Sequence, residues 1–370
     1  MKVHMTMKAA KVAIASGALA LAMSGVADAK NFNLQMQTNM GPGSPHEVLL
    51  KEFAQRVETM SEGSIKINVL PRGAIVDWPE IPDAVSKGLV EMGQSWTHFY
   101  TGKHPAAGLF NAPLGGAGTG LDQMGHLSWM MYGGGKELNQ EFWQDVLGLN
   151  VVEFQIIPDG PEALGWFKEP IETMDDFRKL KFRTPPGLPG EAYTEMGVSV
   201  VSMMASELIP AMASGAVDAG EWINPSTDLD IGFPDVAKYY SLQGLHQAID
   251  ISVILINKDV WESMSDSQRA IIEIATEATI TRALTFFVHA NAKALRILTE
   301  EKGVTLFDPP ADYPDEFLAA ANAVLERRME DPFFAKVMKS IQEFSDTAVP
   351  YRLETLKQSL FLGEAGLKAK

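Results

Sequence analysis

Residues 180–247 contain Lys181-Phe182-Arg183, Glu207-Leu208-Ile209-Pro210-Ala211 and Val217-Asp218-Ala219-Gly220-Glu221-Trp222. The pattern predicts a strand that ends on a cation, a strand–helix unit, and a strand that ends on a carboxylate and an indole. Open α/β sheets bind ligands at the carboxyl ends of their strands, so we expect Arg183 and Glu221 beside a small-molecule site. The planar guanidinium of Arg183 suits a carboxylate ligand. Glu221 would repel that ligand unless it holds a cation or accepts a proton from the ligand.

A helix–glycine–strand unit occurs twice in the sequence. Residues 84–94 align without gaps on residues 211–221, with glycine at positions 88 and 215. Each glycine stands where the end of a helix favours a positive φ angle. We therefore expect an α/β fold of two lobes, each built on the same local unit.

The N-terminus carries the pattern of a secretory signal peptide. Three lysines precede an apolar stretch at residues 12–26, and Ala27-Asp28-Ala29 fits the small-residue cleavage pattern. The alternative is a membrane anchor, but the apolar stretch is short for a span of about 20 residues. We expect residues 1–29 to be a signal peptide that is cleaved after Ala29, which would place the protein in a bacterial periplasm.

Charge and cysteine content exclude several classes of partner and chemistry. Removal of the signal peptide would take three lysines and one aspartate from 31 basic and 47 acidic residues, leaving a net charge of −18. Such an acidic chain does not suit nucleic acid or an anionic membrane as a partner. The sequence has no cysteine, which excludes disulfides, thiol nucleophiles and cysteine metal sites.

The expected organisation has two lobes joined by a long helix. We expect an N-terminal α/β lobe at residues 30–154, completed by part of residues 249–330, and a second α/β lobe at residues 155–248. Ser265-x-x-Gln268 is a capping box. Because neither glycine nor proline follows until after residue 302, a helix over 265–302 would reach about 57 Å and brace both lobes.

The C-terminal segment, residues 331–370, is also predicted to be helical. Its last part carries Leu353, Leu356 and Leu360 at helical spacing. This apolar face is either part of the core or an exposed contact in a homodimer.

Enzyme motifs are absent from the sequence. It has no G-x-S-x-G, no H-E-x-x-H and no phosphate loop, since the glycine-rich segment at 115–120 lacks the required spacing and lysine. Asp159 and Glu162 could form a catalytic carboxylate pair, but they lie on a predicted turn rich in proline and glycine. A periplasmic hydrolase remains the alternative from another class.

Several of these segments resemble a known family. The strand at 181–183, the helix start at 207–211, the unit at 215–220 and Asn257-Lys258-Asp259-Val260-Trp261 are similar to those of DctP-type solute-binding proteins of tripartite ATP-independent periplasmic (TRAP) transporters. The resemblance covers the whole expected mature chain. It implies a two-lobed periplasmic-binding-protein fold of the type II kind, with hinge strands and a long bracing helix. It also implies capture of one organic anion and its delivery to a membrane permease, without catalysis.

Three shorter segments, Tyr132-Gly133-Gly134-Gly135, Gly220-Glu221-Trp222 and Leu245-His246-Gln247, resemble a narrower branch of the family. That branch binds 2-oxo or 2-hydroxy monocarboxylates, such as pyruvate or lactate, together with a metal ion. The resemblance implies that Arg183 clamps the carboxylate of the substrate. It also implies a Na⁺ or Ca²⁺ site that bridges to this carboxylate and is made by Gln155, Glu221, the carbonyl of Trp222, and Gln247.

The resemblance also suggests residues that select the substrate. Tyr100 matches a tyrosine of the binding cleft, Phe99 is expected to line the pocket, and Asn224 is close enough in sequence to add a hydrogen bond; Gln155 and Trp222 are also expected at the substrate. Because His98 and Phe99 stand where the branch often has more tyrosine, an aromatic 2-oxo acid stays open as the ligand. The sequence is also compatible with a dicarboxylate or a sugar acid, and with a binding protein that serves a transporter or sensor of a different kind.

Overall fold

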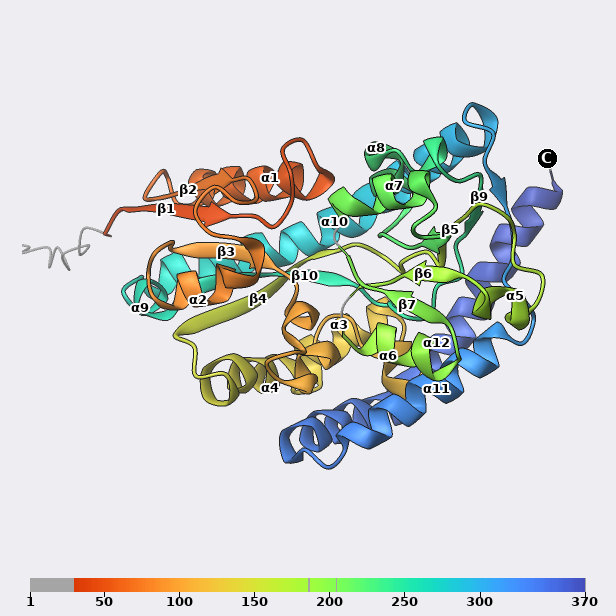
Figure 1. Cartoon of the computed structure of the whole chain (residues 1–370). Coiled ribbons are helices and arrows are strands. Elements are labelled where there is room, and N and C mark those ends of the chain that lie inside the picture. The colour runs from red at the N-terminus through yellow and green to blue at the C-terminus, as the bar shows by residue number, and fades with distance from the viewer. Residues whose placement is uncertain (1–29, 186, 204, 370) are drawn as a thin grey trace, which may run out of the picture.

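Two β-sheets form the centres of two lobes in the computed structural model, which describes residues 30–185, 187–203 and 205–369 (Figure 1). Helices cover both sheets, so the fold is α/β, as predicted. The predicted signal peptide, residues 1–29, lies outside the described residues.

The first sheet has the strand order β2-β1-β3-β10-β4. Its strands are β1 (Phe32–Gln37), β2 (Ile65–Leu70), β3 (Met92–Ser95), β4 (Val151–Pro158) and β10 (Ile251–Asn257). Every residue of β10 is buried, because this apolar strand lies between β3 and β4 and pairs antiparallel with both. The buried residues Leu49, Phe53 and Val57 of α1 (Pro45–Met60) belong to the same hydrophobic core as this sheet.

The second sheet has the strand order β11-β9-β5-β8-β6-β7. Its strands are β5 (Gly165–Phe167), β6 (Lys181–Arg183), β7 (Ser199–Val201), β8 (Ala219–Gly220), β9 (Tyr239–Ser241) and β11 (Thr305–Leu306). The helices of this part of the chain are α5 (Met174–Arg178), α6 (Leu188–Glu195), α7 (Ala205–Ser214) and α8 (Pro225–Ile231). The division that we expected between residues 154 and 155 falls inside β4, and the chain enters the second sheet only at Gly165.

The two copies of the repeated unit end their helices in the same way. Gly88 has φ 70° and Gly215 has φ 77°, so both take the left-handed conformation that the sequence predicted. Leu89 donates its backbone N–H to the carbonyl of Ala84 at 2.9 Å, and Ala216 donates to Ala211 at the same distance. These matching bonds turn the chain from α2 (Ile81–Ser86) toward β3 and from α7 toward β8.

The repeat also places equivalent residues at the strand ends. Gly93 of β3 pairs with Gln37 of β1, and Gly220 of β8 pairs with Arg183 of β6. Arg183 therefore holds the place in the second lobe that Gln37 holds in the first. Both strand pairs are parallel, so their carboxyl ends lie at one edge of each sheet.

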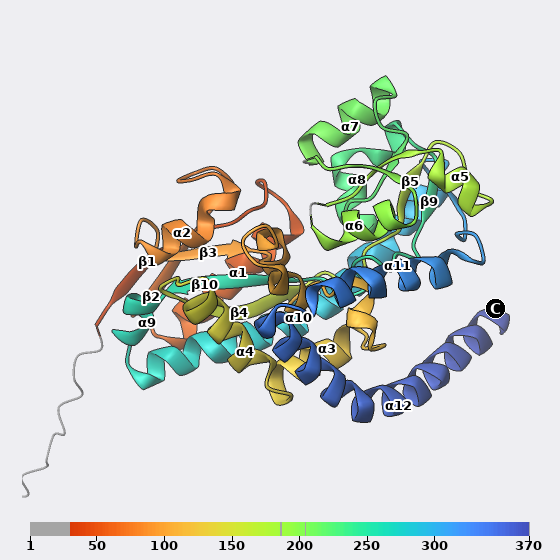
Figure 2. The same cartoon turned by 60° about the horizontal axis from the view of Figure 1, so that its bottom comes forward.

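The helix α10 (Asp266–Glu300) runs past both lobes, as Figures 1 and 2 show. It begins at the predicted capping box, in which Ser265 and Gln268 bond to each other's backbone N–H. It contacts α1 and β4 of the first lobe and α8 of the second. The 35-residue helix therefore joins the two lobes along one side.

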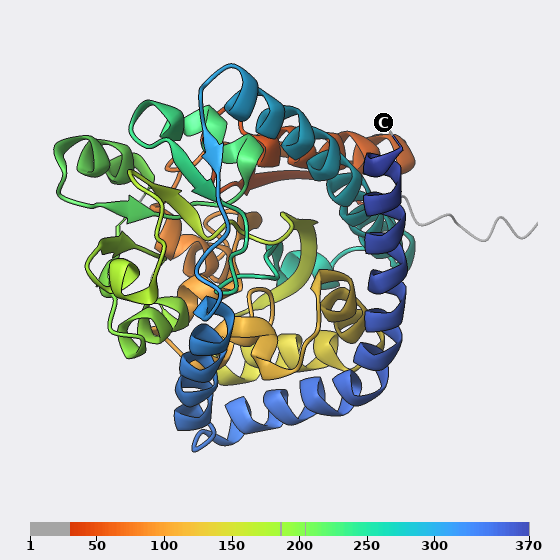
Figure 3. The ribbon, with the colours of Figure 1, turned by 90° about the vertical axis from the view of Figure 1, so that its right-hand side faces the viewer.

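The helix α12 (Pro332–Lys368) has a packed half and an exposed half. Its first half contacts α3 (Gln123–Tyr132) and α4 (Gly135–Glu141), whereas its second half projects from the body in Figure 2. Figure 3 shows the helix bending near its middle, where Pro350 lies inside it. Every helix of the described residues is too short or too polar to cross a membrane.

Candidate functional site

A pocket lies between the two lobes and contains about 650 Å³ of empty space, its open mouth included. The first lobe lines it with Met40, Arg72, Trp78, Trp96, His98 and Phe99. The second lobe and the connecting segments add Glu162, Arg183, Glu221, Trp222, Gln247 and Asp250. One side of the pocket is therefore largely aromatic, whereas the other carries most of its charges.

Arg183 is buried at the end of β6 and is held by three hydrogen bonds. Its Nε donates to the carbonyl of Met203 at 3.0 Å, and its Nη1 donates to both the carbonyl and the Oε1 of Glu221 at 2.8 Å. Its guanidinium also lies 5.2 Å from the ring centre of Trp222. No hydrogen bond among the described residues uses Nη2, so this donor remains for another acceptor.

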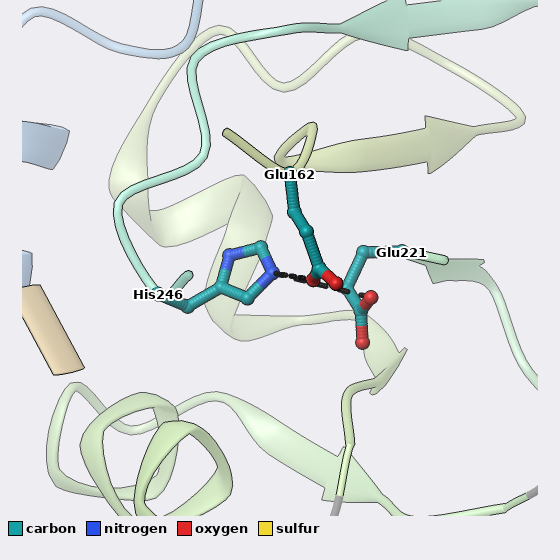
Figure 4. A group of neighbouring side chains, drawn as sticks. All are labelled: Glu162, Glu221 and His246. Atoms are coloured by element: carbon teal, nitrogen blue, oxygen red, sulfur yellow. Dashed lines mark hydrogen bonds and ion pairs between the residues drawn. The ribbon is translucent and has the colours of Figure 1, made fainter. Parts of the chain in front are cut away.

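Glu162, Glu221 and His246 form a group (Figure 4), and Glu221 in this group pairs with Arg183 at 2.8 Å. The Nε2 atom of His246 lies 3.3 Å from Oε2 of Glu162 and 3.9 Å from Oε2 of Glu221. One ligand atom from each residue lies within 4.8 Å of the others, as a shared metal ion would require. Burial, together with the nearby charge of Arg183, lowers the pKa of His246 to about 3, so its ring is neutral at pH 7.

The site holds more buried acids than buried bases. Asp159, Glu162, Glu221 and Asp250 are all at most 4% exposed, and Arg183 is the only buried lysine or arginine of the described residues. Burial raises the pKa of Glu221 to about 8, and burial with neighbouring carboxylates raises the pKa of Glu162 and Asp250. Because Oε2 of Glu221 has no hydrogen-bond partner among the described residues, a cation would relieve both the repulsion and the desolvation.

Five residues of the predicted site meet at this pocket. They are Phe99, Arg183, Glu221, Trp222 and Gln247. They come from both lobes, although more than a hundred residues separate the first from the last in sequence. The structure therefore brings the expected carboxylate clamp and three of the expected cation ligands into one place.

Tyr100 and Asn224 lie next to the pocket but do not line it. The hydroxyl of Tyr100 is 2.8 Å from that of Ser95, and its buried ring packs edge-on against Trp143. Asn224 is the N-cap of α8, and its Nδ2 donates to the carbonyl of Asp159 at 3.1 Å. Both side chains are therefore held by contacts with residues behind the lining of the pocket.

Gln155 lies at a different cavity, beside α3 and α10. Its Nε2 donates to the carbonyl of Phe110 at 2.7 Å, and its Oε1 has no hydrogen-bond partner among the described residues. Glu153, two residues earlier on β4, lines the same cavity and accepts from Nδ2 of Asn139 at 2.6 Å. The structure does not bring Gln155 to Glu221 and Trp222.

We expect Glu153 to make stability depend on pH, since burial raises its pKa from 4.5 to about 8. Between these values the unfolded chain releases a proton that the folded chain keeps, so the free energy of unfolding falls as pH rises. A Glu153→Gln variant is expected to be more stable than the wild type at pH 8, by on the order of 2–4 kcal/mol, and equal to it near pH 4. Urea unfolding across this range measures the difference.

The control for this prediction is Glu277→Gln, which changes an exposed carboxylate at the same cavity. It is expected to leave the pH profile of the wild type unchanged. A Glu153→Gln profile parallel to that of the wild type would show that Glu153 is ionised in the folded chain.

Sequence reasoning did not assign four residues of this site to ligand or cation binding. Asp159 and Glu162 were assigned to a turn, and Asp250 and His246 received no chemistry of their own. One signal was present, because Asp159 directly follows β4 and Asp250 directly precedes β10. Ile251 and Pro158 pair across these two strands, so the two aspartates had to be neighbours.

The chain matches the sequence model of one protein family over residues 36–331. That family is described as bacterial extracellular solute-binding protein, family 7. The chain is also 30% identical over 298 residues to the monocarboxylate 2-oxoacid-binding periplasmic protein of Nostoc. This match covers 79% of the present chain and 78% of the Nostoc protein.

Two solved structures of TRAP solute-binding proteins are similar over almost the whole chain. The protein from Bordetella bronchiseptica is 26% identical with a TM-score of 0.84, covering 92% of this chain and 100% of that one. Its structure is a dimer with copurified calcium and picolinate in one site and an apo second site. The protein from Pseudoalteromonas atlantica, with bound sodium and pyruvate, is 25% identical with a TM-score of 0.80, covering 90% and 99%.

Proposed function

The chain belongs to bacterial extracellular solute-binding protein family 7, as a solute-binding protein of the TRAP transporter kind, and from this premise we propose a ligand and a site. The protein captures a 2-oxo or 2-hydroxy monocarboxylate together with a cation and delivers it to a TRAP permease. Because the family consists of transporter receptors, we propose that the protein binds this acid without catalysis. We also propose that it is exported to the periplasm with cleavage after Ala29.

The observation that carries this proposal is the position of Arg183 beside two buried glutamates in an interlobe pocket. The Nη2 of Arg183, which makes no hydrogen bond to the described residues, would bind the carboxylate of the ligand, as guanidinium groups do in buried sites. Capture of the ligand between the lobes would then stabilise a closed arrangement, because the ligand contacts both of them.

The cation would be held by Glu162 and Glu221, with the carbonyl of Trp222 and the side chain of Gln247 as further oxygen ligands. Glu162 replaces Gln155 in this proposal, because it lines the pocket and Gln155 does not. When bound, the cation would neutralise the glutamates and polarise the ligand's carboxylate and 2-oxo oxygens. Two protein carboxylates beside an anionic ligand favour the divalent Ca²⁺ over Na⁺.

The aromatic side of the pocket favours an acid with a larger side chain as the second candidate. Trp78 and Trp96 both pack against Phe99, with ring centres 5.0 and 5.7 Å from it. These rings offer apolar surface to an aromatic 2-oxo acid. A dicarboxylate or sugar acid has less support, because Arg72, the only other arginine or lysine of the described residues that lines the pocket, is exposed to solvent, whereas Arg183 is buried.

A thermal-shift screen of the purified mature chain tests the proposed function. Pyruvate, lactate, phenylpyruvate, succinate and glucuronate are each added with calcium or with EGTA. Saturating ligand raises stability by a few kcal/mol, which gives a measurable rise in melting temperature. We expect rises with the 2-oxo or 2-hydroxy acids that depend on calcium. If the melting temperature rises only with succinate or glucuronate, and by the same amount in calcium and in EGTA, the proposed ligand and cation are contradicted.

We further propose that the exposed half of α12 joins two copies of the chain. Leu360, Phe361 and Leu362 are consecutive residues of this half and are 63–70% exposed, and apolar surface of this kind marks an interaction site. A Leu360→Asp, Phe361→Asp variant is expected to be monomeric by analytical ultracentrifugation at concentrations where the wild type is a dimer. The matched control, Ser359→Asp, adds a charge to the same turn and is expected to remain dimeric. A monomeric wild type would contradict the proposal.

A further inference from the structure

A chain of hydrogen bonds runs from His246, beside Glu162 and Glu221, back to α11 (Tyr313–Arg328). The Nδ1 atom of His246 lies 3.0 Å from the hydroxyl of Tyr193, and that hydroxyl lies 3.3 Å from the hydroxyl of Tyr313. All three side chains are fully buried. They come from the segment between β9 and β10, from α6 and from α11, so three separate elements meet behind the site.

The surroundings of His246 determine which of its ring nitrogens carries the proton. Its Nε2 faces carboxylate oxygens of Glu162 at 3.3 Å and Glu221 at 3.9 Å. The proposed cation requires both glutamates to be ionised; a lone pair on Nε2 would then be repelled by their oxygens, whereas an N–H donates to them. The proton therefore belongs on Nε2, and Nδ1 accepts the hydrogen bond from Tyr193.

The hydroxyls of Tyr193 and Tyr313 continue the chain in the same direction. Burial raises the pKa of the Tyr313 phenol, so its hydroxyl keeps its proton at neutral pH. Because the Tyr193 hydroxyl gives its one proton to His246, its oxygen accepts the hydrogen bond from the Tyr313 hydroxyl, 3.3 Å away. Each group thus donates to the next, from Tyr313 through Tyr193 to the ring of His246.

We propose that His246 is a positioning residue for the cation and not one of its ligands. Its Nε2–H donates to Oε2 of Glu162 and so fixes the rotamer of this carboxylate, and Tyr193 and Tyr313 fix the tautomer of His246. The inference rests on the proposed cation site. Hard cations such as Ca²⁺ take oxygen ligands, so an imidazole nitrogen is better used behind the carboxylate than at the ion.

A Tyr193→Phe variant removes the hydroxyl that holds Nδ1 and keeps the buried ring. We expect the calcium affinity, measured by isothermal titration calorimetry with saturating pyruvate, to fall about 10- to 100-fold, as for other groups that orient metal ligands. Tyr313→Phe, the second variant, is expected to give a smaller fall in the same direction. Calcium affinities equal to that of the wild type in both variants would overturn the proposal.

The matched control is Tyr240→Phe. Tyr240 is another fully buried tyrosine of the second lobe, and its hydroxyl donates to Asp228 at 2.9 Å instead of to His246. Its loss is expected to lower thermal stability but to leave calcium affinity unchanged. If calcium affinity falls equally in Tyr240→Phe and Tyr193→Phe, the fall comes from a general loss of stability, and the role assigned to Tyr193 and His246 is overturned.

A direct measurement separates a positioning residue from a ligand. Nitrogen-15 NMR of the histidine ring nitrogens in the purified chain, assigned with a His246→Gln variant, reports which nitrogen of His246 is protonated. We expect a protonated Nε2 when calcium and pyruvate are bound. An unprotonated Nε2 in this calcium-bound state would make His246 a ligand and overturn the inference.

These experiments also distinguish this inference from the proposed function. If the wild type shows no calcium-dependent binding of pyruvate, lactate or phenylpyruvate, the proposed function fails, and the inference fails with it. If that binding is present but His246 has an unprotonated Nε2, only the inference fails.

Discussion

Replacing Arg183 by methionine is expected to abolish the rise in melting temperature that the preferred 2-oxo acid gives with calcium. Methionine keeps much of the length of the side chain but removes the donors that would bind the carboxylate. Loss of one partner of a buried, hydrogen-bonded charge pair costs about 2–5 kcal/mol, so affinity is expected to fall at least about thirtyfold. The fold is expected to survive, because burial already raises the pKa of Glu221 to about 8 and its carboxyl can take a proton.

Two further variants make this experiment specific. Arg183→Lys keeps the charge and loses the planar fork, so its affinity is expected to lie between those of the wild type and Arg183→Met. Arg328→Met removes an arginine that pairs with Glu191 at 2.5 Å on the surface of the same half of the molecule, and it is expected to bind as the wild type does. An Arg183→Met protein with affinity within threefold of the wild type would show that another group holds the carboxylate.

Removing the cation is expected to weaken binding of the acid by a factor on the order of 100 or more. Without it, Glu162 and Glu221 would either face the ligand's carboxylate as like charges, which repel by about 4 kcal/mol at 4 Å and an effective dielectric constant of 20, or have to bind protons before the ligand enters. The measurement is calorimetric titration with pyruvate in EGTA, with choline in place of sodium, followed by addition of calcium or sodium. Calcium is expected to restore more affinity than sodium at equal concentration.

Glutamine variants test whether the two carboxylates cause this dependence. Glu162→Gln with Glu221→Gln removes both charges, so binding of the acid is expected to lose most of its response to calcium. Glu153→Gln removes a buried carboxylate at the other cavity and is expected to keep the full response. Unchanged affinity of the wild type in EGTA and choline would falsify the cation site.

Local sequence patterns predicted much of the fold because local forces decide those features. The capping box at Ser265 and the helix-ending glycines at 88 and 215 depend on nearby backbone groups, and the structure confirms them. Arg183 and Glu221 also meet as expected, since β6 and β8 are neighbouring parallel strands and their ends lie side by side. Their contact follows from strand direction, which the sequence pattern indicates.

The remaining parts of the site depend on packing between distant segments. The alternation of β4 puts Gln155 on one face, but the position of Phe110 and α3 decides that this face lies away from the pocket. Asp159 and Glu162 look exposed in sequence because prolines and a glycine surround them. They are buried because their turn lies where the two lobes meet, which no local pattern shows.

The position of β10 in the first sheet affects when the protein can fold during its synthesis. This strand lies between β3 and β4, so the first sheet stays open until residue 257 has been made. The second sheet likewise lacks an edge strand until β11, at Thr305–Leu306, reaches β9. Contacts so distant in sequence form slowly, since long loops must close first. For a chain that is exported, as we propose, this late assembly favours passage across the membrane before either sheet is complete.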